Sequence, residues 1–285
     1  MTIGQAFFDT RNVLLPLYDD REAAAIAHAL MEHITGMSKL DRLMYKDDVL
    51  EGKRLEAWQE VVEMAVSGMP LQYIVGRAWF MDREYMVNEH VLIPRPETEE
   101  LVHWVRNDRV GATQLRILDV GTGSGCIPIS LKKEFPDAVV ASCDISAAAL
   151  DVARHNAAMH HADITFIQMD FLDSSIWQWL EEYDIIISNP PYIPVAERGN
   201  MHRNVKDFEP ELALFVPDND ALVFYRALAE FGKRHLVPGG SIYCETERRY
   251  GHETRELFAT EGYCDVILRQ DMHDNDRMVK ATRPV

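Results

Sequence analysis

The chain has 285 residues, of which 47% are hydrophobic, and this is enough for one or two domains with substantial cores. Its 46 acidic and 29 basic residues give a formal net charge of −17, which argues against a protein that grips nucleic acid mainly through phosphates. The four cysteines form no CxxC pair and favour reduced thiols over disulfides or zinc. Because no apolar run could span a bilayer and no signal-like leader is present, we expect a cytoplasmic protein without a membrane partner.

Residues 1–68 have the pattern of a small helical bundle. Apolar residues recur at helical spacing over 21–35, and Gly36 marks the end of that helix. A second helix is predicted over 48–67, ending before Gly68. The segment contains no cluster of catalytic residue types. We interpret it as an N-terminal domain that recognises a partner, with a purely stabilising role as the alternative.

The spacing of apolar residues is no longer helical in residues 69–94, which we interpret as a linker. Short strands are predicted at 73–76, 79–81 and 85–87, around a turn at Asp82-Arg83. The linker is therefore expected to form a β-hairpin.

Residues 92–99 read Leu-Ile-Pro-Arg-Pro-Glu-Thr-Glu. The prolines favour an extended segment, and the acidic residues favour the start of a helix, where the helix dipole stabilises negative charge. Glu97 either lines a substrate pocket or only starts the helix. Arg95 either binds a backbone carbonyl of a substrate or pairs with an acid.

From residue 115 strands and helices alternate, which predicts an α/β domain with a mostly parallel sheet and right-handed crossovers. We assign 95–285 to this domain. Strands are predicted at 115–120, 138–143, 163–168, 183–188, 239–245 and 262–268, and helices at 125–134, 146–159, 174–181, 220–235 and 250–260.

The first predicted strand runs into a glycine-rich loop, Gly121-Thr122-Gly123-Ser124-Gly125. Glycines let the backbone approach a ligand closely, and the following helix presents free N–H groups. The spacing is GxGxG and not the GxGxxG of dinucleotide-binding loops. A nucleoside cofactor with an amino-acid tail therefore fits better than a pyrophosphate.

Two further strand ends carry candidate cofactor ligands. Asp144 follows the glycines by about 20 residues, the spacing at which an acid binds ribose hydroxyls. The alternative for Asp144 is a helix N-cap, a role for which Ser146 competes. Asp170 can accept from an adenine amine, and Phe171 can cover the ring or belong to the core.

The predicted strand 183–188 ends in Asn189-Pro190-Pro191-Tyr192. The side-chain oxygen of Asn189 and the carbonyl of Pro190 are two acceptors that suit a planar NH2 group. Tyr192 can stack on the same plane. The alternative is an ordinary turn that ends a strand, since Asn and Pro are common there.

The long segment 193–218 is expected to form a loop that covers the substrate, because loops of this length are usually functional or disordered. Asp271, Asp274 and Asp276 indicate a hairpin turn before a last strand. No metal site is predicted.

Taken together, these residues resemble class I S-adenosylmethionine-dependent methyltransferases that methylate amino groups. The nearer resemblance is to the release factor glutamine methyltransferases of the HemK/PrmC type. It rests on the glycine loop, Asp144, Asn189-Pro190-Pro191-Tyr192, the segment 91–99 and Phe208-Glu209-Pro210, and it extends along most of the chain.

The resemblance implies a Rossmann-like class I methyltransferase sheet, S-adenosyl-L-methionine as cofactor and peptide chain release factors as protein substrate, with no direct contact to nucleic acid. Methyl transfer to N5 of the glutamine in a Gly-Gly-Gln loop is the implied reaction. Asn189 and Pro190 would orient the amide, Pro191 and Tyr192 would complete the substrate site, and Asn189 would also neighbour the cofactor.

The chain departs from the family in two places, with Ala221 where a glycine is usual and Glu245-Thr246-Glu247 where Glu-x-Gly is usual. Three alternatives remain open at this stage. They are a glutamine methyltransferase for a ribosomal protein, a nucleic-acid amino-group methyltransferase that flips an adenine or guanine, and a cofactor-binding adaptor without activity.

Overall fold

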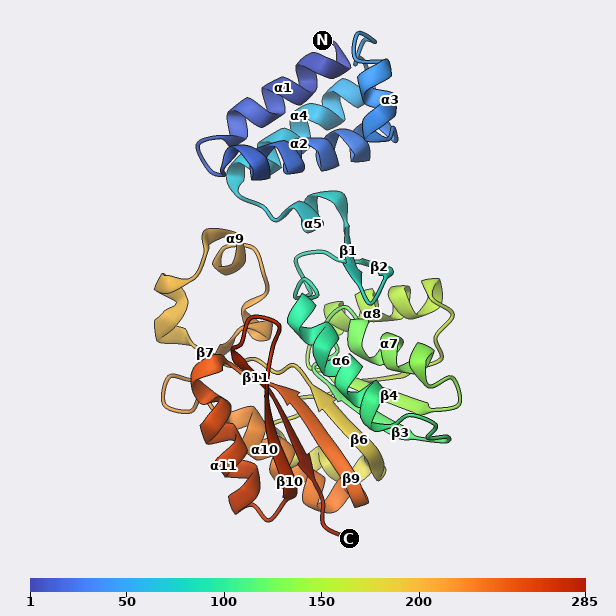
Figure 1. Cartoon of the computed structure of the whole chain (residues 1–285), viewed down its shortest axis with the longest axis vertical. Coiled ribbons are helices and arrows are strands. Elements are labelled where there is room, and N and C mark those ends of the chain that lie inside the picture. The colour runs from blue at the N-terminus through green and yellow to red at the C-terminus, as the bar shows by residue number, and fades with distance from the viewer. The chain divides into compact units, whose positions relative to one another are not determined.

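The computed structural model describes residues 1–285, which pack into two compact units (Figure 1). The helical unit comprises Met1–Arg77 and His202–Phe208, and the sheet unit comprises Ala78–Met201 and Glu209–Val285. None of the helices is both long enough and apolar enough to cross a membrane.

The helical unit is a bundle of short helices, as its hydrophobic period predicts. Its core joins Leu14, Leu30 and Ala65 from three different helices. The helices are α1 (Ile3–Leu14), α2 (Asp20–Thr35), α3 (Lys39–Met44), α4 (Lys53–Ser67), α5 (Leu71–Val75) and α9 (Arg203–Lys206).

Side chains and glycines at the helix ends explain these boundaries. Thr2 and Ser38 form capping boxes at the starts of α1 and α3, and Asp19 caps α2. Gly36 and Gly68 end α2 and α4 in the left-handed conformation, with φ of 68° and 92°, which glycine adopts without a steric penalty.

The predicted strand at 73–76 is wrong, because this segment is helix α5. Pro70 precedes the helix, and Gly76 ends it with φ of 72°. The β-type residues Tyr73 and Val75 misled the prediction. Ile74 is buried in the helical core, so tertiary packing prevails over the strand preference of this short run.

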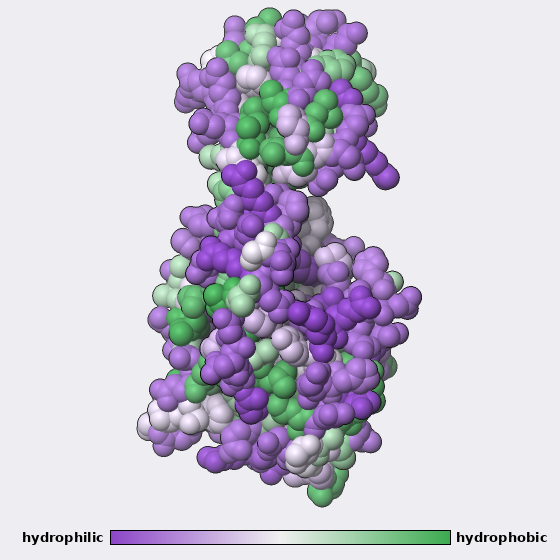
Figure 2. Space-filling view, turned by 90° about the vertical axis from the view of Figure 1, so that its left-hand side faces the viewer, coloured by the Kyte–Doolittle hydropathy of each residue, from purple (hydrophilic) through white to green (hydrophobic).

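The helical unit exposes many large apolar side chains, and an apolar area is visible on it in Figure 2. The exposed residues in its first three helices and the adjoining turns are Phe8, Val13, Leu15, Leu17, Leu40, Leu43, Met44, Tyr45 and Val49.

The sheet unit is built on a seven-stranded sheet in the order β10-β11-β9-β6-β3-β4-β5. Strands β3, β4, β5, β6 and β9 are parallel, and β11 runs antiparallel to both of its neighbours. The strands are β3 (Arg116–Val120), β4 (Val139–Asp144), β5 (Thr165–Gln168), β6 (Tyr183–Ser188), β9 (Leu236–Glu245), β10 (Cys264–Gln270) and β11 (Asp276–Thr282).

Helices cover both faces of this sheet (Figure 1), which explains why the parallel strands are continuously apolar. Ile185 and Ile187 of β6 join one core, and Ile186 joins the other. The first core includes α6 (Pro96–Asp108), α7 (Cys126–Glu134) and α8 (Ala147–Met159), and the second includes η1 (Ser174–Trp179), α10 (Val223–His235) and α11 (Gly251–Thr260).

The predicted alternation of strands and helices is confirmed, with local differences in the bounds or type of some elements. Strand β9 begins at Leu236, before the predicted start at 239. The predicted helix 174–181 is the 3-10 helix η1.

The linker hairpin consists of β1 (Arg77–Phe80) and β2 (Arg83–Met86). Its turn lies at Met81 and Asp82, which both have positive φ, and not at Asp82-Arg83. Asn156 of α8 binds Met86 with both ends of its carboxamide, at 2.8 and 2.9 Å. The hairpin is thereby attached to the sheet unit.

Segment 193–218 leaves and re-enters the sheet unit through a short parallel pair, β7 (Ile193–Pro194) and β8 (Phe215–Val216). Between them lie η2 (Val195–Asn200), α9 and η3 (Glu211–Ala213). Within the helical unit, Asn204 of α9 donates a hydrogen bond to the Tyr18 hydroxyl at 3.0 Å.

Gly232 of α10 provides a test of the packing between α10 and the sheet. A Cβ at this position would lie 2.3 Å from the Tyr263 hydroxyl and 2.8 Å from Cδ1 of Ile242. We expect Gly232→Ala to lower the free energy of unfolding by about 1–3 kcal/mol, because overpacking outweighs the better helix propensity of alanine.

The matched control is Gly199→Ala, whose added Cβ meets no atom within 4 Å. Denaturant unfolding of both variants measures the difference. Equal stabilities would contradict the tight packing at Gly232.

Candidate active site

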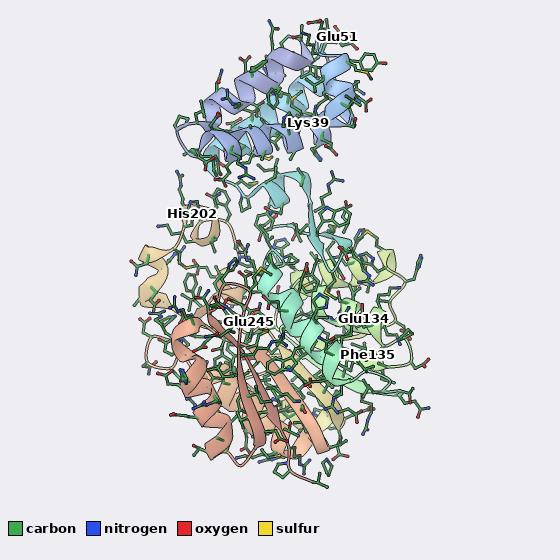
Figure 3. All side chains as sticks on the ribbon, viewed as in Figure 1. Lys39, Glu51, Glu134, Phe135, His202 and Glu245 are labelled. Atoms are coloured by element: carbon green, nitrogen blue, oxygen red, sulfur yellow. The ribbon has the colours of Figure 1, made fainter.

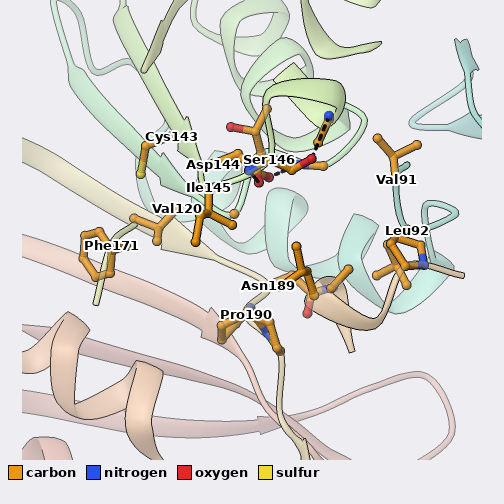
Figure 4. Close-up of a pocket in the computed structure, with 18 of the residues that line it drawn as sticks. Val91, Leu92, Val120, Cys143, Asp144, Ile145, Ser146, Phe171, Asn189 and Pro190 are labelled. Carbon is orange, nitrogen blue, oxygen red and sulfur yellow. Dashed lines mark hydrogen bonds between the residues drawn. The ribbon is translucent and has the colours of Figure 1, made fainter. Parts of the chain in front are cut away.

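A cavity of about 340 Å³ opens at the carboxyl ends of β3, β4 and β6, which is the edge where ligands bind in sheets of this type. Residues from both predicted sites line it. Asp144 and Ser146 lie on one side, with Asn189 and Pro190 across from them (Figure 4). The structure therefore brings the glycine loop and the Asn-Pro-Pro turn into one site.

The glycine loop has the backbone that its sequence predicts. Gly121, Gly123 and Gly125 have φ of 88°, 52° and 81°, a region that disfavours side chains. A Cβ on Gly125 would lie 3.1 Å from the Cβ of Ala153. Thr122 and Ser124 between them also line the cavity, so all five predicted loop residues lie at the site or shape it.

The loop is attached to its surroundings by buried polar groups. The backbone N–H of Gly121 and of Thr122 both donate to the Cys143 carbonyl, at 2.9 and 3.1 Å. Asn156 donates to the Ser124 carbonyl at 2.8 Å. The loop conformation is thus held before any ligand binds.

Asp144 lies at the end of β4 and lines the cavity. It accepts hydrogen bonds from the N–H groups of Gly123 at 3.0 Å and Ser146 at 2.9 Å. Burial raises the pKa of its carboxyl, while these N–H groups oppose the shift. Ser146 caps α8 through its own hydroxyl, so Asp144 is not needed as the N-cap.

Asp119 is a fully buried acid beside the glycine loop, and the sequence reasoning gave it no role. Ser142 donates to one oxygen of its carboxylate at 2.6 Å, and Thr122 shares a 2.6 Å hydrogen bond with Ser142. The other oxygen, Oδ1, is buried without a partner. Its signal in the sequence was an acid near the end of a buried strand, two residues before the first loop glycine.

Asp170 and Phe171 both line the cavity. The Phe171 ring also packs in the core against Trp177 and Phe231, with ring centroids 5.5 and 5.2 Å away.

Two aliphatic residues beside these strand ends escaped the sequence reasoning. Ile145 and Leu172 line the same cavity and remain 48% and 39% exposed. Apolar side chains left open at a cavity suit the faces of a flat ring. In the sequence, Ile145 directly follows Asp144, and Leu172 lies two residues after Asp170.

The Asn-Pro-Pro turn lies next to the glycine loop because β6 pairs with β3. The Ser188 hydroxyl donates to the Val120 carbonyl at 2.7 Å, and a Cβ on Gly121 would lie 3.7 Å from the Asn189 carbonyl oxygen. Asn189, Pro190 and Pro191 all line the cavity.

Tyr192 is placed differently from the stacking position that the sequence suggested. It is not among the residues that line the cavity, and its hydroxyl donates to Oε1 of Glu245 at 3.3 Å. Burial, followed by the nearby Glu245 charge, raises the pKa of Tyr192 well above its usual range. The structure therefore gives Tyr192 a supporting position.

Arg95 and Glu97 are separated by the start of α6. Arg95 lines the cavity, and its Nη2 donates to Oε1 of Glu209 at 2.5 Å. Glu209 is buried and also accepts from the Ile93 N–H at 3.2 Å, so the pairing of Arg95 with an acid is observed. Glu97 lies in the first turn of α6 and does not line the cavity.

The insert 193–218 contributes part of the cavity wall through Pro210, Leu212, Phe215 and Pro217. Leu212 is 67% exposed. The expectation that this segment covers a substrate stays a prediction.

The sheet order, with an antiparallel strand inserted beside β9, and the cavity beside a GxGxG loop define a class I methyltransferase fold. Residues 98–205 match the methyltransferase small domain family, and residues 14–76 match the PrmC N-terminal domain family. A methyltransferase from Pyrococcus furiosus has a similar fold, with a TM-score of 0.50 and 15% identity over 70% of this chain and 89% of that one.

Sequence similarity to known proteins identifies the family more narrowly than the fold does. The release factor glutamine methyltransferase of Flavobacterium psychrophilum is 40% identical, covering 94% of both chains. That of Bacteroides thetaiotaomicron is 41% identical, covering 96% of this chain and 97% of the relative. The chain belongs to the release factor glutamine methyltransferase family.

Asp119 gives a pH prediction for the stability of the sheet unit. Burial raises the pKa of its carboxyl to about 7. The folded protein therefore binds a proton that the unfolded chain has already released above about pH 4. The stabilisation from this proton is full below that pH and is lost as the pH rises towards 7.

Relative to Asp119→Asn, the wild-type protein should lose roughly 1.4 kcal/mol of unfolding free energy per pH unit between about pH 5 and 7. Denaturant unfolding of both proteins across this range measures the difference, and the other titrating groups cancel between them. Parallel pH profiles would contradict the raised pKa.

Proposed function

We propose that this protein transfers a methyl group from S-adenosyl-L-methionine to the side-chain amide nitrogen of the glutamine in the Gly-Gly-Gln loop of bacterial peptide chain release factors. The proposal rests on the observation that two sets of residues line one cavity. The glycine loop at Gly121 and the acceptors of Asn189 and Pro190 lie side by side.

The glycine-loop half of the cavity fits the cofactor. Asp144 retains lone pairs for ribose hydroxyls, and Ile145 and Leu172 offer apolar surface to a flat base. The buried Asp119 carboxylate has an unpaired oxygen, so a positive charge such as the cofactor's ammonium is favoured beside the loop. The bound cofactor supplies an electrophilic methyl group on a sulfonium.

The Asn-Pro-Pro half of the cavity fits a carboxamide. An amide nitrogen is a poor nucleophile because its lone pair is delocalised into the carbonyl. The side-chain oxygen of Asn189 and the Pro190 carbonyl accept its two N–H groups and aim the nitrogen at the methyl carbon. Orientation of this kind contributes up to roughly 7–11 kcal/mol in the best cases.

The same two acceptors stabilise the positive charge that develops on the nitrogen as the N–C bond forms and the C–S bond breaks. The extra proton leaves the product amide for water after transfer. No strong general base is needed before the attack, because placement of the nitrogen is the limiting requirement.

Recognition of the release factor is assigned to the helical unit. Two features support this assignment, the match of residues 14–76 to the PrmC N-terminal domain and the exposed apolar side chains of α1 and α3. Apolar surface favours contact with another protein. The net charge of −17 disfavours a nucleic-acid substrate.

Methyl transfer from labelled S-adenosylmethionine to purified release factors tests the function. A matched release factor with the Gly-Gly-Gln glutamine changed to alanine is the control. Label should appear on the normal factor and be absent from the alanine form. Label on a ribosomal protein or a nucleic acid in the same assay, and none on the release factor, would replace the proposed substrate.

Asn189→Ala tests the orientation of the amide. Loss of one acceptor should lower kcat at least about 100-fold, as expected when a reacting group is misplaced. Cofactor affinity, measured by calorimetry, should change by less than about threefold, because the glycine loop and Asp144 are intact. An equal loss of turnover and cofactor binding would contradict the role assigned to Asn189.

A further inference from the structure

The side chain of Asn189 and two buried side chains, Thr98 and Glu245, form a continuous hydrogen-bonded chain. The Asn189 side chain donates through Nδ2 to Oγ1 of Thr98 at 3.0 Å. The Thr98 hydroxyl donates to Oε2 of Glu245 at 2.7 Å. Thr98 is 3% exposed and Glu245 is 2% exposed, so the bond between these two side chains is shielded from water.

We infer that Thr98 and Glu245 are positioning residues that select which end of the Asn189 carboxamide faces the cavity. The inference rests on the proposed function, in which the oxygen of Asn189 accepts from the substrate amide.

The direction of the hydrogen bonds follows from the chemistry of the groups. In the structure the single hydroxyl hydrogen of Thr98 points to Oε2 of Glu245, as it must when that carboxyl is ionised and can only accept. Thr98 then has only lone pairs left for Asn189. The Asn189 group that faces Thr98 must therefore be its NH2, and its oxygen remains for the cavity.

Selection is needed because the two ends of a carboxamide have nearly the same shape, so packing alone does not distinguish them. The reversed side chain would present NH2 to the cavity. Two donors would then meet when a substrate amide entered, and the nitrogen would lose its acceptor. In the reversed form the Asn189 oxygen would face the Thr98 oxygen, and neither could donate a hydrogen bond to the other. The hydrogen-bonded relay from Asn189 through Thr98 to Glu245 therefore disfavours the reversed form.

The sheet and helix α6 bring the three residues together. Strand register pairs Ser188 of β6 with Cys244 of β9, so Asn189 and Glu245 follow at the same edge. Glu245 is the last residue of β9, where Figure 3 places it. Thr98 reaches both from the first turn of α6.

The charge of Glu245 is controlled by the groups that face it. Burial raises the pKa of its carboxyl, and the charge of Glu97 adds to this shift. The hydrogen bonds from Thr98 and Tyr192 and the positive charge of Arg277 act in the opposite direction and favour the ionised form. Arg277 is itself held by Asp271, with Nε donating to Oδ2 at 3.1 Å. Glu245 also accepts a hydrogen bond from the Tyr192 hydroxyl, so one carboxyl group binds Tyr192 directly and Asn189 through Thr98.

Two substitutions of Thr98 separate positioning from packing. Thr98→Val keeps the shape and removes the hydroxyl, whereas Thr98→Ser keeps the hydroxyl and removes a methyl group. We expect Thr98→Val to lower kcat for release factor methylation at least about tenfold, with the KM values and the cofactor affinity near those of wild type. Thr98→Ser should recover most of that loss.

Thr254→Val is the matched control. Thr254 is also a fully buried threonine, and its hydroxyl meets the Thr246 hydroxyl at 3.3 Å and not Glu245. The inference is overturned if Thr98→Val retains kcat within about twofold of wild type, or if Thr98→Ser loses as much as Thr98→Val.

A measurement that needs neither activity nor a variant tests the relay directly. The side-chain NH2 of Asn189 should show slow hydrogen exchange by NMR in the wild-type protein, since it is bonded to buried Thr98. Exchange as fast as that of an exposed asparagine overturns the inference, even if a Thr98 variant fails to fold. Absence of methylation by the wild-type enzyme, with slow exchange retained, would refute the proposed function and leave the relay standing.

Discussion

The parallel pairing of β3 with β4 on one side and β6 on the other is the constraint on which the site depends. Because these strands run in the same direction, their carboxyl ends meet at one edge. Val120 pairs with both Cys143 and Ser188. This register places the glycine loop between the strand ends that carry Asp144 and Asn189, residues far apart in the sequence.

The cofactor half and the substrate half of the cavity have different requirements, and different residues meet them. The cofactor half combines a fixed backbone with a carboxyl group, Asp144, that lines the cavity. The substrate half provides acceptors whose direction must be controlled by side chains behind them. The turn is therefore rigid for two reasons, the prolines in its backbone and the polar relay beneath it.

Local patterns in the sequence predicted the strand ends, the glycine loop and the Asn-Pro-Pro turn, because each depends on residues adjacent in the chain. The same reasoning failed at α5, where burial of Ile74 overrode strand preference, and did not place Tyr192, whose direction depends on Glu245. The bond between Thr98 and Glu245 joins residues 147 positions apart. No periodicity reports such a contact, so it required the three-dimensional structure.

The carboxamide of Asn156 joins two parts of the sheet unit, the linker hairpin and the glycine loop. It binds Met86 in the linker hairpin and the Ser124 carbonyl in the glycine loop. The hairpin is consequently an integral part of the enzyme's cofactor half and not a mere spacer. A truncated catalytic fragment for crystallisation or inhibitor screening must begin before β1, since a fragment starting at Arg95 would lack the backbone partner that keeps Asn156 in place.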